Sequence, residues 1–181
     1  MKTEVAQPVA KTPSACSDME VADFVALVLA GGEVIADGLE GRVRAAERIV
    51  FLRRSECLVG VAGLKRPSDN HRKEVATSAG VPLPPDAFPF ELGWVFIMPS
   101  ARGNHLSLPL CHPLIEAAGD RGVFATSKTG NGGMHNTLRK LGFSSAGKAY
   151  PSPRGNYQLQ VFLRHAAQPC TAADRPQAAV R

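Results

Sequence analysis

The chain has 181 residues, of which 44% are hydrophobic and 20% are charged, and it carries a formal net charge of +5 at pH 7. This length favours one domain with a proper core over two, and the composition excludes a disordered or fibrous chain. No apolar run approaches the roughly 20 residues that a membrane-spanning helix needs, and residues 1–17 lack the pattern of a secretory signal. We therefore expect a cytoplasmic protein with no membrane partner.

The cysteines predict neither a metal site nor a disulfide framework, because the four of them are scattered and form no CxxC pair. The positive net charge would suit an anionic partner. A nucleotide-phosphate cofactor explains this charge as well as nucleic acid does.

The sequence predicts one folded domain between two flexible tails. Residues 1–17 and 166–181 are rich in Ala, Pro, Thr and Gln and show no apolar periodicity. The folded domain is therefore expected to span residues 18–165.

The predicted elements of this domain alternate between helices and strands. In chain order they are helices at 18–30 and 33–46, strands at 48–53, 57–64 and 90–98, a helix at 104–118, a strand at 123–127, a helix at 133–141, and strands at 148–150 and 158–163. Ser55-Glu56 is the expected turn of a hairpin. Residues 65–89 are predicted to form a long basic loop, because their prolines forbid a central strand.

The order of these elements predicts a mixed α+β fold in a single domain. Adjacent strands favour hairpins, whereas the two strand–helix–strand passages imply local parallel pairing. We expect a mixed, mostly antiparallel twisted sheet with helices on both faces.

The segment from Trp94 to Ser107 has the form of a strand that runs into a turn and a helix. In such a turn, free backbone N–H groups at the start of the helix converge on one point and can bind an anion. Arg102 adds a positive charge, and Gly103 allows the backbone to approach closely. The helix dipole is worth only about 0.3–1 kcal/mol there, so the amides and Arg102 would provide most of the binding.

This turn resembles the pyrophosphate loop of the GNAT (general N-acetyltransferase) superfamily, Arg/Gln-x-x-Gly-x-Gly/Ala, which follows the fourth strand and holds the CoA pyrophosphate. Arg102 falls on the first position, whereas His105 stands where Gly is usual and Ser107 where Gly or Ala is usual. The His105 side chain would either crowd the phosphates or hydrogen-bond them.

A second segment, Val123 to Phe143, also resembles the superfamily, with a strand, a loop that ends in Asn131, a short helix and a closing Leu-Gly-Phe. In the family this Asn typically contacts the pantetheine arm; a helix N-cap is its alternative role, and the two roles are compatible. The resemblance implies that acetyl-CoA binds as a co-substrate. The residues that would contact it are Phe96, Ile97, Met98, Arg102, Gly103, Asn104, His105, Leu106, Ser107 and Asn131.

The resemblance further implies direct attack of an amine on the thioester, without a covalent enzyme intermediate. Deprotonating a lysine-like amine at pH 7 costs roughly 4.6 kcal/mol, so a base would help. Glu91 is the candidate base, since partial desolvation is expected to raise its pKa; a structural carboxylate is the alternative. Many family members use a tyrosine as general acid, but Leu138 occupies that position, so His135 and Tyr150 are the candidates.

Three functions remain open from the sequence: an N-acetyltransferase for an amine acceptor, a nucleic-acid-modifying acyltransferase, and a non-catalytic acyl-CoA-binding protein. The basic segment would border the acceptor cleft in such a fold. It is expected either to be a solvated loop or to contact an acidic protein surface or nucleic acid through Lys65, Arg66, Arg72 and Lys73. A monomer and a homodimer are both compatible with the sequence.

Overall fold

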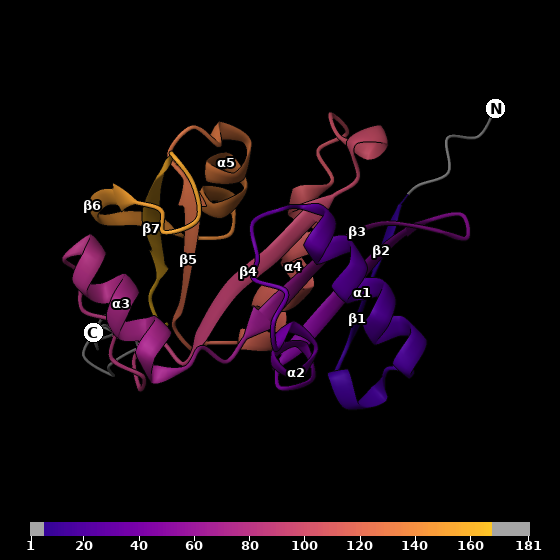
Figure 1. The fold of residues 1–181 in the computed structure, drawn as a ribbon, viewed down its shortest axis with the longest axis horizontal. Helices are drawn as coiled ribbons and strands as arrows, with labels where there is room; N and C mark the ends of the chain where they lie inside the picture. Colours follow the sequence, from indigo (N-terminus) through magenta and orange to yellow (C-terminus); the bar gives the residue numbers. More distant parts are fainter. Residues whose placement is uncertain (1–5, 168–181) are drawn as a thin grey trace, which may run out of the picture.

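The computed structural model describes residues 6–167, which form one seven-stranded sheet with helices on both faces (Figure 1). The strands are β1 (Gln7–Lys11), β2 (Arg48–Arg54), β3 (Cys57–Lys65), β4 (Phe90–Ile97), β5 (Val123–Lys128), β6 (Ser144–Pro151) and β7 (Gln158–Arg164). The α-helices are α1 (Asp18–Ala30), α2 (Leu39–Arg44), α3 (Asp69–Ala79), α4 (Ser107–Ala118) and α5 (Gly132–Lys140), and short 3-10 helices cover Pro13–Ala15 and Pro99–Ala101. None of the helices in this part of the chain is long and apolar enough to cross a bilayer.

The sheet has the strand order β1-β2-β3-β4-β5-β7-β6 and is mostly antiparallel. Among the described residues, β4 and β5 form the one parallel pair. The predicted fold class, a mixed and mostly antiparallel sheet between helices, is confirmed.

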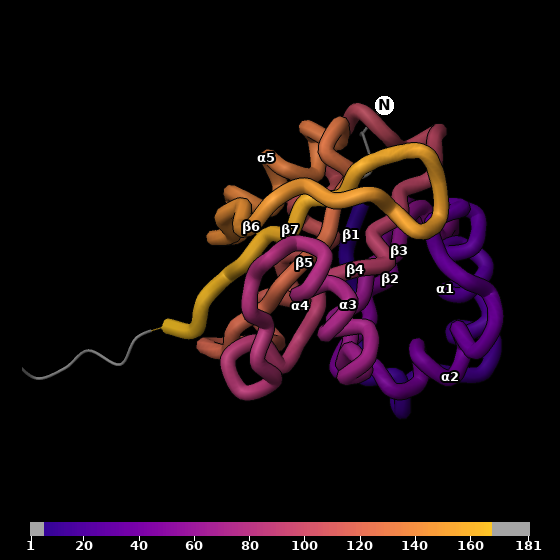
Figure 2. The backbone as a smooth tube through the Cα atoms, turned by 60° about the vertical axis from the view of Figure 1, so that its left-hand side comes forward, coloured from indigo at the N-terminus to yellow at the C-terminus, as the bar shows by residue number. Residues whose placement is uncertain are grey.

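Three apolar clusters hold the helices on the sheet. Helices α4 and α5 share a cluster with one face, whereas α1 and α2 pack on the other face and α3 packs over the end formed by β5, β7 and β6. Figure 1 shows α1 and α3 in front of the sheet and α4 behind it. Figure 2 shows the loop between β6 and β7 extending from its own end of the sheet towards α1.

The central strand β4 carries an irregularity that shapes the rest of the molecule. Val61 of β3 pairs with Phe96, but Gly63 pairs with Gly93, so β4 has one extra residue between these pairs. Trp94 lies in this bulge with a φ of 53°, which is rare for a residue with a side chain. An added Cβ at Gly63 would lie 2.5 Å from the Trp94 ring, so the glycine makes room for the indole.

Beyond the bulge, β4 and β5 separate. Their pairing covers Phe90 to Leu92 opposite Val123 to Ala125, although β4 continues to Ile97 and β5 to Lys128. From there β5 stays paired with β7, and β4 with β3. The two strands therefore diverge, as Figure 1 shows, and leave an opening in the middle of the sheet.

Three sequence expectations were wrong. Residues 7–11 are not a tail, because they form β1, which pairs antiparallel with β2. Residues 65–89 are not one loop, because α3 begins after the Ser68 cap and ends at Gly80 in a left-handed conformation. The helix expected over 33–46 is reduced to α2. Of the predicted C-terminal tail, residues 168–181 lie outside the described residues.

Gly147 is the position where a side chain is least tolerable on β6. Its φ is +66°, and a Cβ there would lie 2.3 Å from the Ala79 carbonyl oxygen at the end of α3. We expect Gly147→Ala to lower the free energy of unfolding by roughly 2–3 kcal/mol, measured by urea denaturation. Gly130→Ala is the control, because nothing lies within 4 Å of its Cβ. Equal losses in the two variants would contradict this packing.

Candidate active site

The opening between β4 and β5 is part of a cleft of about 2060 Å³. This volume exceeds the roughly 300–1,000 Å³ of an ordinary ligand pocket, so two ligands can meet in it. One end of the cleft is lined by the turn before α4 and by the start of α5. The other end is lined by the α1–α2 connection, α3 and the β6–β7 loop.

The turn before α4 has the geometry of an anion site. β4 ends at Ile97, a 3-10 helix covers Pro99–Ala101, and α4 begins at Ser107. Gly103 and His105 both have positive φ, 80° and 53°. Within the described residues, no N–H group from Gly103 to Ser107 donates to a backbone oxygen in the loop and capping hydrogen bonds, so these donors are available at the cleft.

Arg102 and His105 both lie at the cleft. The Arg102 Nε donates to the Ile97 carbonyl at 3.0 Å, and its guanidinium lies 5.7 Å from the centre of the Phe96 ring. Arg102 is therefore held against the end of β4 while it lines the cleft. The His105 side chain is exposed at the cleft wall, where both of its expected roles at the phosphates stay open.

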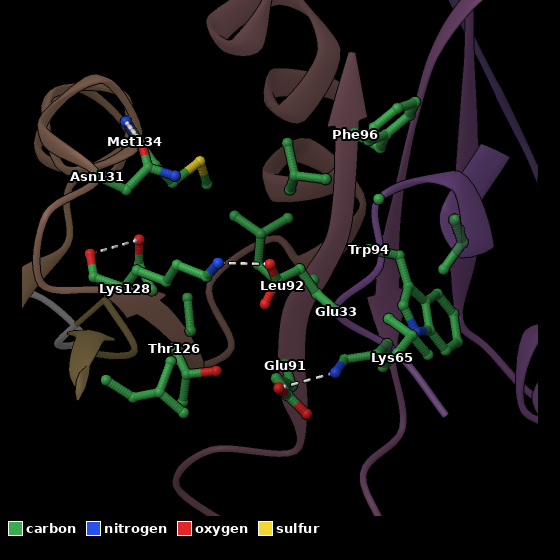
Figure 3. Close-up of a pocket in the computed structure, with 18 of the residues that line it drawn as sticks. Glu33, Lys65, Glu91, Leu92, Trp94, Phe96, Thr126, Lys128, Asn131 and Met134 are labelled. Carbon is green, nitrogen blue, oxygen red and sulfur yellow. Dashed lines mark hydrogen bonds and ion pairs between the residues drawn. The ribbon is translucent and has the colours of Figure 1, made fainter. Parts of the chain in front are cut away.

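Asn131 caps α5 and faces the cleft at the same time. Its side-chain oxygen accepts the Met134 N–H at 3.1 Å (Figure 3). Both roles expected for this residue are therefore geometrically compatible. The start of α5 is also joined to α4, because the Ser107 and Thr137 hydroxyls lie 2.7 Å apart.

Three predicted site residues do not line the cleft. Met98 uses its N–H to bind the Val59 carbonyl, and the Asn104 side chain donates to the Ala101 carbonyl. The His135 Nε2 lies 2.9 Å from the Lys128 carbonyl oxygen, and its ring packs against Phe162. His135 thus has a structural role, which argues against its use as the general acid.

Glu91 is a buried carboxylate in an ion-pair network. Its side-chain oxygens lie 2.8 Å from the Lys65 Nζ and 3.0 Å from the His71 Nε2 (Figure 3). Burial alone raises the pKa of Glu91, but the Lys65 ammonium and the hydrogen bond from His71 outweigh it and lower that pKa to about 2. The predicted rise was therefore wrong, because β3 pairing places Lys65 directly opposite Glu91.

Tyr150 lies on β6 and lines the cleft while only 7% exposed. Burial and the nearby Glu91 carboxylate raise the pKa of Tyr150 to about 12. Its phenol therefore stays protonated at neutral pH, and it can act as a hydrogen-bond donor in the cleft.

The chain resembles known proteins in its structure but not in its sequence. No family model and no curated protein sequence matches the chain. Three solved structures are similar over nearly their whole length. ElaA from Escherichia coli has a TM-score of 0.65 and 16% identity, covering 88% of this chain and 99% of that one. The yncA protein from Salmonella typhimurium, solved with acetyl-CoA, has a TM-score of 0.62 and 14% identity, covering 97% and 99%.

The third similar structure gives the fold its name. It is a Desulfovibrio desulfuricans protein assigned to the GNAT family, with a TM-score of 0.60, 14% identity and coverage of 90% of this chain and 100% of that one. The protein has the GNAT fold. The GNAT-like fold that the two sequence segments indicated is thereby confirmed.

The basic segment does not present one cationic surface on this GNAT fold. Lys65 pairs with Glu91, and Arg66 pairs with Glu47. Arg72 is 6% exposed and donates to the Phe88 carbonyl. Three of the four cations expected to reach a nucleic acid therefore have partners within the protein, whereas Lys73 is exposed. No group of three or more potential metal ligands occurs in residues 6–167.

The sequence missed a polar cluster that crosses the cleft. Glu33, in the α1–α2 connection, lies 2.5 Å from the Lys128 Nζ at the end of β5 (Figure 3). The Tyr157 hydroxyl donates to the same carboxylate at 2.7 Å, and Arg154 donates to the Glu33 carbonyl at 2.6 Å. Pairs more than 90 residues apart carry no local signal, so only the fold could bring them together.

Glu91→Gln tests the buried network. The variant leaves Lys65 without its counter-ion, so we expect a loss of about 3 kcal/mol in the free energy of unfolding at pH 7. The Glu91 carboxyl of the wild type contributes its full share to the free energy of unfolding above pH 4.5, the pKa of this group in the unfolded chain. It loses this contribution as the pH falls to about 2, its pKa in the folded protein. The difference between the two proteins should therefore shrink between pH 4.5 and pH 2.

The measurement is urea denaturation of both proteins across this pH window. Glu74→Gln is the control, since Glu74 is an exposed carboxylate in the same cleft; its change should stay below about 0.5 kcal/mol. A difference between wild type and Glu91→Gln that does not vary with pH would contradict the lowered pKa.

Proposed function

We propose that this protein is an N-acetyltransferase that transfers the acetyl group of acetyl-CoA to an amine. The observation that carries the proposal is that β4 separates from β5 and then runs into a turn whose main-chain N–H groups have no backbone acceptor. The similar yncA structure, which contains acetyl-CoA, supports the choice of co-substrate. The nucleic-acid alternative has no comparable observation in its favour, and the non-catalytic one shares the cleft and the turn but gives no role to the His71–Glu91 pair.

The cleft fits the parts of acetyl-CoA from one end to the other. The diphosphate would accept hydrogen bonds from the main-chain N–H groups of residues 103–107, with Arg102 beside it. The pantetheine arm would lie along the β4 edge that β5 has left, where the main-chain groups of β4 that point away from β3 would offer it strand-like hydrogen bonds. The thioester would then reach the point near Leu92 where the two strands meet.

The amine must lose a proton before or during its attack on the thioester carbon. A carboxylate with a pKa of about 2 is a poor acceptor for it, so we assign the base to His71 and an orienting role to Glu91. The His71 side chain is 36% exposed and lines the cleft, and its Nε2 is fixed by Glu91. An imidazole held by a carboxylate is a common arrangement for proton transfer at neutral pH.

In the reaction, the amine nitrogen bonds to the acetyl carbon, the carbon–sulfur bond breaks, and the electron pair leaves with the CoA thiolate. Tyr150 is the candidate to stabilise this thiolate. Because its pKa is about 12, the phenol is a donor of a hydrogen bond to the sulfur and a poor source of a fully transferred proton. Solvent can complete the protonation.

Calorimetric titration with acetyl-CoA tests the binding half of the proposal. Binding of acetyl-CoA is expected, and Arg102→Ala should weaken it by about ten-fold, because a charged hydrogen-bonding group near the diphosphate is lost. Lys73→Ala removes an exposed cation outside the cleft and should leave the affinity unchanged. No binding at millimolar acetyl-CoA would sink the proposal.

Release of CoA in the presence of a panel of amines tests the catalytic half. His71→Gln should lower kcat/KM by about 100-fold at pH 7 with an unchanged affinity for acetyl-CoA. Part of the rate should return at higher pH, where more of the amine is free. His112→Gln, on the outer side of α4, is the matched control. Binding without CoA release from any amine would favour the non-catalytic alternative instead.

A further inference from the structure

The cluster that crosses the cleft brings two hydrogen-bond donors, Lys128 and Tyr157, onto the Glu33 carboxylate, and a third donor, Arg154, onto the Glu33 main-chain carbonyl. Lys128 comes from the end of β5, and Arg154 and Tyr157 come from the β6–β7 loop. All three meet at Glu33, and Figure 3 shows its carboxylate paired with Lys128. An ammonium, a guanidinium and a phenol in one place are the donors that proteins use to bind carboxylates.

Glu33 is held in this cluster only weakly. The side chains of Glu33 and Lys128 are 46% and 41% exposed, and an ion pair that is half exposed contributes little to stability. The segment that carries Glu33 is irregular and lies between Gly32 and Gly38, both in left-handed conformations. A small rearrangement at these glycines can therefore withdraw the Glu33 carboxylate from Lys128 and Tyr157, and it would also free Arg154 from the Glu33 carbonyl.

The position of the cluster matches the acceptor side of the reaction. All four residues line the same cleft as His71 and Tyr150. In Figure 3 the Glu33–Lys128 pair lies across the cleft in front of Leu92, the residue at which β4 and β5 stop pairing. An acceptor that brings its amine to this point would have to displace Glu33 or lie against it.

We propose that Lys128, Arg154 and Tyr157 form a carboxylate-binding subsite for the acceptor, and that Glu33 is an internal carboxylate that fills the subsite in the free protein. The acceptor class is then a small amine that also carries a carboxylate, such as a free amino acid. This inference rests on the proposed acetyl transfer. It adds a specificity that the transfer itself does not require.

Matched acceptor pairs test the subsite through activity. Phenylalanine and phenethylamine differ only in the carboxylate, as do lysine and cadaverine. The carboxylated member of each pair should have a kcat/KM for CoA release at least ten-fold higher. Lys128→Met should abolish this preference by raising KM for the carboxylated member alone. Lys148→Met, the same change on β6 outside the cleft, should preserve it.

Product binding tests the subsite without turnover. In the presence of CoA, calorimetry should find N-acetylphenylalanine bound more tightly than N-acetylphenethylamine. Glu33→Gln should raise the affinity for the carboxylated product by about two- to five-fold, since the side chain that competes for the subsite loses its charge. A purely structural role of Glu33 predicts no gain in affinity.

The outcomes separate the two proposals. The subsite is overturned if acetyl-CoA still binds but the two members of each amine pair are used equally, the two products bind equally, or the carboxylated amines are not acetylated. The acetyl-transfer proposal stands in each of these cases. Loss of acetyl-CoA binding overturns the acetyl-transfer proposal itself.

Discussion

The separation of β4 from β5 is the constraint on which the rest of the site depends. Backbone N–H and C=O groups need hydrogen-bond partners. Beyond Leu92 and Ala125, the facing edges of β4 and β5 no longer pair with each other. The bulge at Trp94 turns β4 away, and β7 keeps β5 in place. The opened edges can then serve an elongated ligand, and the turn that follows β4 supplies further N–H donors at one end.

The charges in the cleft are arranged in pairs that limit what each group can do. Lys65 and His71 keep Glu91 ionised although it is buried, so the carboxylate is better suited to fixing an imidazole than to taking a proton. Tyr150 is kept neutral by the same carboxylate and by burial. Lys65 and Arg66 neutralise neighbouring acids, so the net charge of +5 does not translate directly into free cations along the basic segment.

Local patterns predicted much of the fold, and long-range pairing accounts for what they missed. The hairpin around Ser55, the buried β4 strand and the Asn131 cap each have a signal within a few residues. The sequence QPVAK of β1 has no such signal and becomes a strand because it pairs with β2. The lowered pKa of Glu91 and the Glu33 cluster likewise arise from partners distant in the sequence.

A crystal structure of the protein grown with acetyl-CoA measures the central claim directly. We predict the diphosphate within hydrogen-bonding distance of the main-chain N–H groups between Gly103 and Ser107, and the pantetheine between β4 and β5 with its sulfur near Leu92. Acetyl-CoA density at another surface, or a cleft in which β4 and β5 close on each other, would contradict the account.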